Sequence, residues 1–476
     1  MASGPVSAYA CARAGHRLAV ALVSLATVLL AGCSLAPDRP LPDVFTADRY
    51  AHAPQGQWLA ADSVAERAPE QWWLRFKDPE LDRLMSLLAE GNPDLAQAEA
   101  RYREALADLQ AARAGFFPTV TTQGSLSRAG QGAGGPDNPA NTYSLSGSVQ
   151  WEADLWGRVR GSVSAAQAGE QATAADLQGV HLSLQSTLAQ AWFGLISARL
   201  QEHLLDRTLA EYEKALQMTR NRQQAGVASP ADVAASSAQL EQARAQRIRL
   251  AWQTEQQVHA LAVLLGQVPG DFEARLALPA ALPPVPGVPV GVPSVLLLQR
   301  PDIVAARERV AQANARVGVS RAAWFPDLTL GVQGGYRAAE LATWLTAPAR
   351  FWSLGPALAL TLFDGGARRA ATHAAEAVYD MQAAAWRQTV LAGLREVEDA
   401  LVQSQALVDE QQARERALAA ARETLRLVTD QYRAGLVDYL NVVQAQASAL
   451  SAEQAALDLH LERLTAAVRL RVAQGV

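Results

Sequence analysis

Few groups of residues in this chain have the types and spacing that catalysis or ligand binding requires. The segment Gly130–Gly135 reads GQGAGG and has the spacing G-x-G-x-x-G, which dinucleotide-binding proteins use to approach a pyrophosphate. That use requires a strand before the motif and a helix after it, whereas Pro136 and Pro139 follow here. We therefore interpret the segment as a loop and expect no nucleotide or other cofactor.

The histidines and carboxylates show no catalytic or metal-ligand spacing. The 7 histidines are scattered, and the chain contains no H-E-x-x-H, P-loop or G-x-S-x-G sequence. The 2 cysteines both lie in the first 33 residues, which leaves no disulfide framework or cysteine-based metal site. We predict that the chain is not an enzyme and binds no metal. An envelope hydrolase whose site is assembled from distant residues stays open as an alternative.

One cysteine has a specific chemical context. Residues 18–30 form an apolar run that follows two arginines and leads into Leu30-Ala31-Gly32-Cys33. A run of about 13 residues suits a signal peptide and is too short to cross a bilayer. The segment resembles a bacterial lipobox, which implies cleavage before Cys33 and acylation of that residue. Ser34, in place of Asp, then implies delivery to the outer membrane. A short buried helix with a chance cysteine is the alternative.

Composition excludes further classes of protein. The chain has 476 residues, 50% of them hydrophobic, which is enough for two or three domains. Its formal net charge is −5, so the chain lacks the net positive charge that is typical of nucleic-acid-binding proteins. No window approaches the ~18 unbroken apolar residues of a membrane-spanning helix. We therefore expect no nucleic-acid partner.

The elements that would position a site recur along the chain at a constant offset. Asn92-Pro93-Asp94 matches Arg300-Pro301-Asp302, and Phe116-Phe117-Pro118 matches Trp324-Phe325-Pro326, each 208 residues later. Such an offset predicts two structural repeats. We assign the parts of the chain as follows: signal peptide 1–32, N-terminal periplasmic segment 33–91, first repeat 92–265, Pro-rich crossover 266–299 and second repeat 300–476.

Each repeat predicts a helix, two strands, a long helix and a return helix. Apolar and polar residues alternate over the predicted strands 145–154, 327–336 and 357–363, and a further strand, which is mostly polar, is predicted over 119–128. The loop counterpart of the Gly-rich segment is 337–353. Proline-free stretches with heptad spacing predict long coiled-coil helices of roughly 100 Å over 158–225 and 367–434. The return helices are predicted over 231–265 and 439–473.

Three stretches carry a resemblance to a known family. They are Gln71–Leu81, Trp151–Val159 and Ala434–Val442, which are similar to TolC-like outer-membrane efflux lipoproteins of the NodT subgroup. The resemblance implies an α+β membrane protein. In this family a homotrimer forms a twelve-stranded outer-membrane β-barrel, with four strands per chain, continuous with a long α-helical coiled-coil tunnel. The residues agree, because four strands cannot close a barrel and an open edge in lipid is costly.

The resemblance also implies a function and partners. The function is a passive exit duct of a tripartite efflux system that conducts small molecules such as drugs across the outer membrane. The partners are a periplasmic adaptor (membrane fusion) protein, an inner-membrane resistance-nodulation-division pump and outer-membrane lipid. A protein-secretion channel is one alternative. A coiled-coil scaffold lipoprotein without a pore is another, although a scaffold has no need of alternating strands.

Two turns at glycines follow the long helices, and the resemblance assigns roles to the residues around them. Adaptor contact falls on Gly226, Val227, Ala228, Ser229, Gly435, Leu436, Val437 and Asp438. The periplasmic gate of such channels is often a ring of aspartates six and nine residues after the glycine. In the second repeat these positions are Asn441 and Gln444, which predicts a neutral gate, and the first repeat offers Asp232. Alternatively, the constriction lies elsewhere and the amides only cap helix contacts.

Overall fold

The chain, seen in a computed structural model, forms two compact units that both draw on the two predicted repeats. Unit 1 comprises 1–43, 102–173 and 305–387, and unit 2 comprises 44–101, 174–304 and 388–476. The structure describes residues 37, 39, 41, 50–52, 58–59, 69–130, 139–272, 276–287, 290–291 and 300–475. The predicted signal peptide, Cys33 and most of the Gly-rich segment therefore lie outside the described residues.

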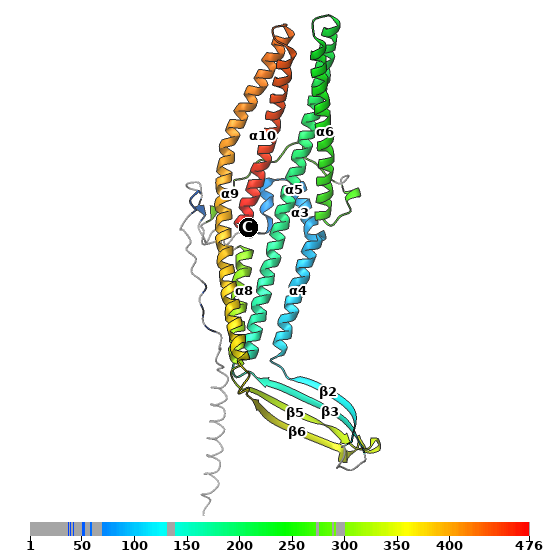
Figure 1. The fold of residues 1–476 in the computed structure, drawn as a ribbon, viewed down its shortest axis with the longest axis vertical. Helices are drawn as coiled ribbons and strands as arrows, with labels where there is room; N and C mark the ends of the chain where they lie inside the picture. Colours follow the sequence, from blue (N-terminus) through cyan, green and yellow to red (C-terminus); the bar gives the residue numbers. More distant parts are fainter. Residues whose placement is uncertain are drawn as a thin grey trace, which may run out of the picture. The chain divides into compact units, whose positions relative to one another are not determined.

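Long helices account for most of the chain (Figure 1). Helices α5 (Arg158–Gln224) and α9 (Ala367–Arg433) have 67 residues each, and α6 (Pro230–Leu264) and α10 (Tyr439–Ala473) have 35 each. These bounds lie within one residue of those predicted. Helices α4 (Pro93–Ala114) and α8 (Pro301–Ala322) have 22 residues each. None of the helices in the described parts of the chain combines the length and apolar composition that a membrane-spanning helix requires.

Unit 1 contains an antiparallel sheet of four strands in the order β2-β3-β5-β6. The strands are β2 (Thr119–Ala129), β3 (Ala140–Ala153), β5 (Asp327–Ala338) and β6 (Arg350–Ala359). Each strand pairs with its neighbour along most of its length. Among the described residues, the outer strands β2 and β6 therefore each keep one edge without a partner strand.

The two faces of the sheet differ in polarity. One row across the four strands is Val120, Val149, Val332 and Leu354, and the next row is Thr121, Ser148, Gln333 and Ser353. Because successive side chains of a strand alternate, these rows lie on opposite faces. The apolar face is exposed, as Val120 at 74% and Leu354 at 70% show. On the polar face, the hydroxyls of Thr121 and Ser148 form a hydrogen bond of 2.7 Å.

The fourth strand differs from its prediction. It was expected over 357–363 but occupies Arg350–Ala359, so Leu360, Leu362 and Phe363 follow the strand. Pairing with β5 decides its position, and Pro356 stands opposite Leu330 in that ladder. An edge strand tolerates a proline. The loop expected over 337–353 shortens accordingly and contains the single turns η4 (Leu341–Thr343) and η5 (Ala347–Ala349).

The main core of unit 2 surrounds the middle of α5. Trp192 and Phe193 of α5 are fully buried against the helix α3 (Pro79–Gly91) and the short helix η1 (Pro69–Phe76). Asp78 joins these elements. Its carboxylate accepts the backbone N–H groups of Glu80 and Leu81, which caps α3, and it also accepts the indole N–H of Trp192 at 2.7 Å. The Gln71–Leu81 stretch therefore builds the core.

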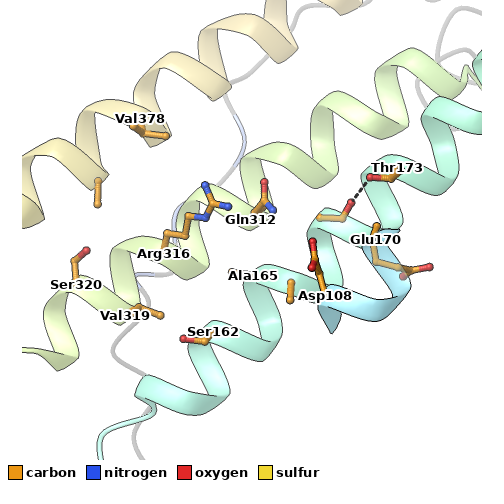
Figure 2. A pocket seen from close by; sticks show the side chains of 14 residues that line it. Asp108, Ser162, Ala165, Glu170, Thr173, Gln312, Arg316, Val319, Ser320 and Val378 are labelled. Carbon is orange, nitrogen blue, oxygen red and sulfur yellow. Dashed lines mark hydrogen bonds between the residues drawn. The ribbon is translucent and has the colours of Figure 1, made fainter. Parts of the chain in front are cut away.

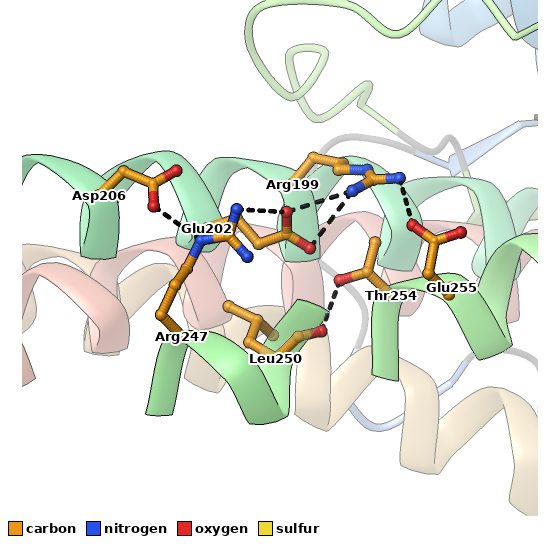
Figure 3. Close-up of polar contacts among 7 residues, drawn as sticks. All are labelled: Arg199, Glu202, Asp206, Arg247, Leu250, Thr254 and Glu255. Carbon is orange, nitrogen blue, oxygen red and sulfur yellow. Dashed lines mark hydrogen bonds and ion pairs between the residues drawn. The ribbon is translucent and has the colours of Figure 1, made fainter. Parts of the chain in front are cut away.

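An ion-pair network joins α5 to α6 (Figure 3). The Glu202 carboxylate is only 6% exposed and lies 3.2 Å from Arg199 and 3.4 Å from Arg247. Arg247 also pairs with Asp206 at 2.7 Å, and Arg199 pairs with Glu255 at 2.9 Å. A buried carboxylate is tolerable when charged partners compensate it, so the network fixes the register of the two helices.

The crossover and the helix ends complete unit 2. Described residues between the repeats include the turn η2 (Pro269–Asp271) and the strand β4 (Val290–Gly291), which pairs in parallel with β1 (Trp58–Leu59). At the end of α6, Asn92 donates to the carbonyl oxygen of Leu264 at 2.6 Å. The corresponding residue of the second repeat, Arg300, donates to the carbonyl oxygen of Ala473 at 3.0 Å. Each return helix thus ends on the residue that precedes α4 or α8.

A close backbone approach at the end of α6 gives a stability prediction. Gly266 has a φ of +66°, and a Cβ atom there would collide with the carbonyl oxygen of Gly91. Gly266→Ala should therefore destabilise the protein by more than about 2 kcal/mol, since left-handed strain alone costs about 1–2 kcal/mol. Gly270→Ala is the control, because no atom lies within 4 Å of its Cβ position. Equal melting temperatures of the two variants, measured by circular dichroism, would contradict this constraint.

Candidate functional site

The first turn, between α5 and α6, is fixed by local hydrogen bonds. Gly226 has a φ of +73°, and the N–H of Val227 donates to the carbonyl of Arg222 at 2.8 Å, as in a Schellman motif. Ser229 then caps α6. Its hydroxyl accepts the N–H of Asp232 at 3.1 Å, and the Asp232 carboxylate accepts the N–H of Ser229 at 2.9 Å. This capping box determines where α6 begins.

The second turn, between α9 and α10, has the same backbone but a different cap. Gly435 has a φ of +75°, and the N–H of Leu436 donates to the carbonyl of Gln431 at 2.9 Å. Asp438 is the N-cap residue of α10, but its side chain makes no capping hydrogen bond. The carboxylate of Asp438 thus faces solvent at this turn, where the first turn uses the hydroxyl of Ser229 in its own cap.

Both turns expose apolar side chains. Val227 is 64% exposed, Leu436 is 75% exposed and Leu440, one turn into α10, is 58% exposed. Of the remaining residues predicted to contact an adaptor, Gly226, Ser229, Gly435 and Asp438 are exposed, and Ala228 and Val437 are half-buried. A shallow groove of about 520 Å³ runs beside the first turn and includes Met218 and Val227 in its lining. Apolar side chains gathered at an exposed end are typical of a docking surface.

Sequence reasoning missed a contact that joins the two hairpins. The guanidinium of Arg222 lies 4.6 Å from the ring centroid of Tyr432 and donates to the carbonyl oxygen of Tyr432 at 3.0 Å. Tyr432 packs against Tyr439 at 5.3 Å, and the Tyr439 hydroxyl donates to the Ser236 hydroxyl at 3.0 Å. We call Arg222, Tyr432, Tyr439 and Ser236 the tip bridge.

The two tyrosines of the tip bridge are buried despite their place near the ends of the helices. Tyr432 is 4% exposed and Tyr439 is 2% exposed. Burial raises the pKa of the Tyr439 phenol, so it stays protonated and donates its hydrogen bond. The only signal in the sequence was a pair of tyrosines near Gly435. Tyr432 lies three residues before this glycine, and Tyr439 lies four residues after it. Nothing in that spacing indicates that Arg222, some 210 residues earlier in the chain, is their partner.

The three predicted gate residues do not come together within one chain. Asn441 and Gln444 are exposed, and their spacing of three residues puts them on one face of α10. The Asn441 amide donates to the carbonyl oxygen of Asp438 at 3.4 Å. Asp232 is half-buried and is engaged in the capping box with Ser229. Within the described residues, no three His, Cys, Asp or Glu side chains form a group that could hold a metal ion.

Known proteins are similar to this chain over nearly its whole length. A sequence model of the family described as outer membrane efflux protein matches residues 84–267 and 292–476. The chain is 30% identical over 463 residues to the probable efflux pump outer membrane protein TtgC of Pseudomonas putida, covering 95% of both. It is 31% identical over 465 residues to the outer membrane protein OprJ of Pseudomonas aeruginosa, covering 95% of this chain and 94% of OprJ. The solved structure of the outer-membrane channel OprN is similar with a TM-score of 0.86 and 31% identity, covering 93% of this chain and 99% of OprN.

Proposed function

This chain belongs to the family of outer membrane efflux proteins, and we propose that it is the exit duct of a tripartite efflux system. Channels of this kind move solutes and break no bonds, so the chain is a transporter and not an enzyme. The observation that carries the proposal is the four-stranded sheet of unit 1, which has one exposed apolar face, one polar face and two open edges.

The open edges support assembly into a closed barrel. Unpaired backbone groups in lipid cost several kcal/mol each, so β2 and β6 must pair with other copies of the sheet. Because neighbouring strands are antiparallel throughout, β6 of one copy runs antiparallel to β2 of the next. Two copies would give a barrel of about eight strands, and side chains fill the interior of a barrel of that size. Three copies give twelve strands and leave a water-filled lumen, with the apolar face toward lipid.

The long helices support a duct that continues beyond the membrane. Helix α5 begins five residues after β3 ends, and α9 begins eight residues after β6 ends. Each then extends for roughly 100 Å at 1.5 Å per residue and ends at a glycine turn. In the homotrimer these helices form a periplasmic tunnel. We assign the turns Gly226–Ser229 and Gly435–Asp438 to contact with a periplasmic adaptor, which connects the duct to an inner-membrane resistance-nodulation-division pump.

The N-terminus supports a second attachment to the membrane. In our proposal residues 1–32 are removed as a lipoprotein signal peptide, and Cys33 is acylated and held in the outer membrane. Arg39, six residues after Cys33, contacts α9. Arg39 pairs with Glu376 at 3.2 Å, and its guanidinium lies 4.9 Å from the ring centroid of Tyr379. The cargo is small molecules such as drugs, chosen by the pump, because a wide aqueous duct selects weakly.

Opening of the duct requires movement at the tips. The tip bridge holds the α5/α6 hairpin to the α9/α10 hairpin of the same copy, so adaptor binding must work against its hydrogen bonds and its cation–π contact. Asn441 and Gln444 are exposed on α10 and are free to meet their equivalents in neighbouring copies. Amide groups close such an aperture by hydrogen bonding, without fixed charge.

The first prediction tests the duct itself. Purified protein should form a heat-modifiable trimer that conducts ions in planar bilayers. Cys33→Ser should abolish acyl labelling and leave trimer formation intact, because the apolar sheet face supplies its own fit to lipid. A soluble monomer with helix and without β-structure would overturn the barrel.

The second prediction tests the tips. Gly435→Val places a β-branched residue at a φ of +75°, which costs about 1–2 kcal/mol and distorts the turn. No atom lies within 4 Å of its Cβ position, so the trimer should assemble. Export of a fluorescent dye from cells and adaptor binding should both fall, and Gly226→Val should act alike. Gly435→Asn is the control, since asparagine tolerates this φ. Normal export by both valine variants would show that these two turns do not contact the adaptor.

The third prediction tests the neutral gate. Wild-type channels should be blocked only weakly by multivalent cations in planar bilayers. Gln444→Asp brings three carboxylates to the aperture and should create strong, voltage-dependent block from the periplasmic side. Ser448→Asp is the control, because Ser448 is also exposed but lies one helical turn further from the tip, and it should have a smaller effect. Strong block of the wild type, or an unchanged Gln444→Asp channel, would mean that the gate lies elsewhere.

A further inference from the structure

The apolar face of the sheet in unit 1 carries charge at one end only. This face comprises the row through Val120 and every second residue along each strand. Among these positions, in four strands that the structure describes completely, only Arg128 of β2 and Arg350 of β6 are charged. Both arginines are exposed, and neither forms an ion pair with a carboxylate of the described residues. None of the roles proposed for the chain uses them.

The two arginines lie at the end of the sheet that is far from the helices. Each strand connects to a helix at its other end, at residues 119, 153, 327 and 359. The helices reached there, α4, α5, α8 and α9, border a hollow of about 660 Å³ whose lining includes the polar side chains of Asp108 and Gln312 (Figure 2). Such hydrophilic helices belong in water. In the duct that we propose, the helical end of the sheet therefore faces the periplasm, and the end with the arginines faces the outer leaflet.

Aromatic side chains on the apolar face surround the two arginines. Tyr336 stands opposite Arg350 in the ladder. Tyr143 follows by two residues the position that pairs with Arg128. Trp352, two residues after Arg350, is 82% exposed. Tyrosine and tryptophan gather where lipid headgroups begin, because these side chains have an apolar body and a polar end. The arginines therefore lie at the level of the headgroups.

Closure of the barrel brings the two arginines to one seam between copies. Within one chain β3 and β5 separate β2 from β6, so Arg128 and Arg350 are at least ~14 Å apart at about 4.8 Å per strand. In the barrel that we propose, β6 of one copy neighbours β2 of the next. Arg350 of one copy and Arg128 of the next copy then lie on adjacent strands, near the same end and on the same face. Each seam of the homotrimer thus presents two guanidinium groups to lipid.

We infer that each seam binds a phosphate group on the sugar headgroup of an outer-leaflet glycolipid, held between Arg350 of one copy and Arg128 of the next. The inference rests on the proposed function, since one chain alone does not contain the site. A guanidinium donates two parallel hydrogen bonds to phosphate oxygens, and such bonds are stronger beside lipid than in water. Glycolipids of a bacterial outer leaflet carry phosphates that divalent cations neutralise. At the seams the arginines take the place of these cations.

The surroundings of the arginines favour a lipid over free phosphate. Leu126, two residues before Arg128, is 66% exposed, and Leu354, four residues after Arg350, is 70% exposed. Both leucines lie on the same apolar face, further toward the middle of the strands. Acyl chains of a bound glycolipid cover these side chains and stabilise the complex, whereas inorganic phosphate gains nothing from them.

Lipid binding to purified trimers is measured by native mass spectrometry with diphosphorylated lipid A. Arg128→Gln and Arg350→Gln should each weaken binding by about tenfold, as expected for the loss of one charge-assisted contact. Removal of the phosphates from the lipid should weaken binding at least as much. Arg337→Gln is the control, because Arg337 lies at the same end of β5 but on the polar face, 4.9 Å from the ring centroid of Phe351. Displacement of lipid A by excess inorganic phosphate would overturn the choice of a lipid.

Mixed trimers test whether two copies share the site. Arg128→Gln and Arg350→Gln chains with tags of different mass are produced together, and trimers that contain both are isolated. One seam of every mixed trimer keeps both arginines, so one lipid A should bind with wild-type affinity, whereas trimers of either variant alone have no such site. Absence of this tight site, or equal binding by the wild type and both variants, would overturn the seam site and leave the duct standing. A wild-type chain that forms no trimer would instead refute the proposed function.

Discussion

The backbone hydrogen bonds that β2 and β6 cannot make within one chain are the constraint on which the rest of the structure depends. Water satisfies such groups at the edge of a soluble sheet, but lipid offers no partner. The exposed apolar face, with Val120 and Leu354, requires lipid, so the two features together require other copies. Symmetric closure satisfies both edges by one repeated contact. In the barrel that we propose, the oligomer therefore follows from the open edges of the sheet.

The same constraint explains why the two faces of the sheet differ in polarity and why the helices contain small residues. A closed barrel places one face in lipid and the other in water. The row through Val120 is apolar and suits lipid, and the row through Thr121 is polar and suits water. In the duct that we propose, the helices that continue from the strands form part of its wall. Alanines and glycines allow such helices to approach closely. Gly161, for example, leaves no room for a Cβ atom beside the side chain of Val319.

How much of the fold and of the candidate site could be predicted depends on how local each signal in the sequence is. The bounds of α5 and α9 followed from glycines and prolines that act on their own neighbourhood, and the family followed from short stretches of sequence. The predicted position of the fourth strand was wrong, because pairing with β5 places β6 over Arg350–Ala359. The tip bridge and the Glu202 network were invisible, since Arg222 meets Tyr432, and Arg247 meets Glu202, only after the chain folds back.

The distribution of packing along unit 2 bears on how a duct can be rigid and still open. The large core around Trp192 and Phe193 surrounds the middle of α5, where α3 and α6 are also fixed by Asp78 and the Glu202 network. Toward the turns only small clusters remain, such as Tyr432, Tyr439 and Val442. Regions with fewer buried apolar contacts open at lower free energy. The tips are therefore the part of unit 2 that a docking partner would move most easily, and the few bonds of the tip bridge set how firmly the two hairpins hold together.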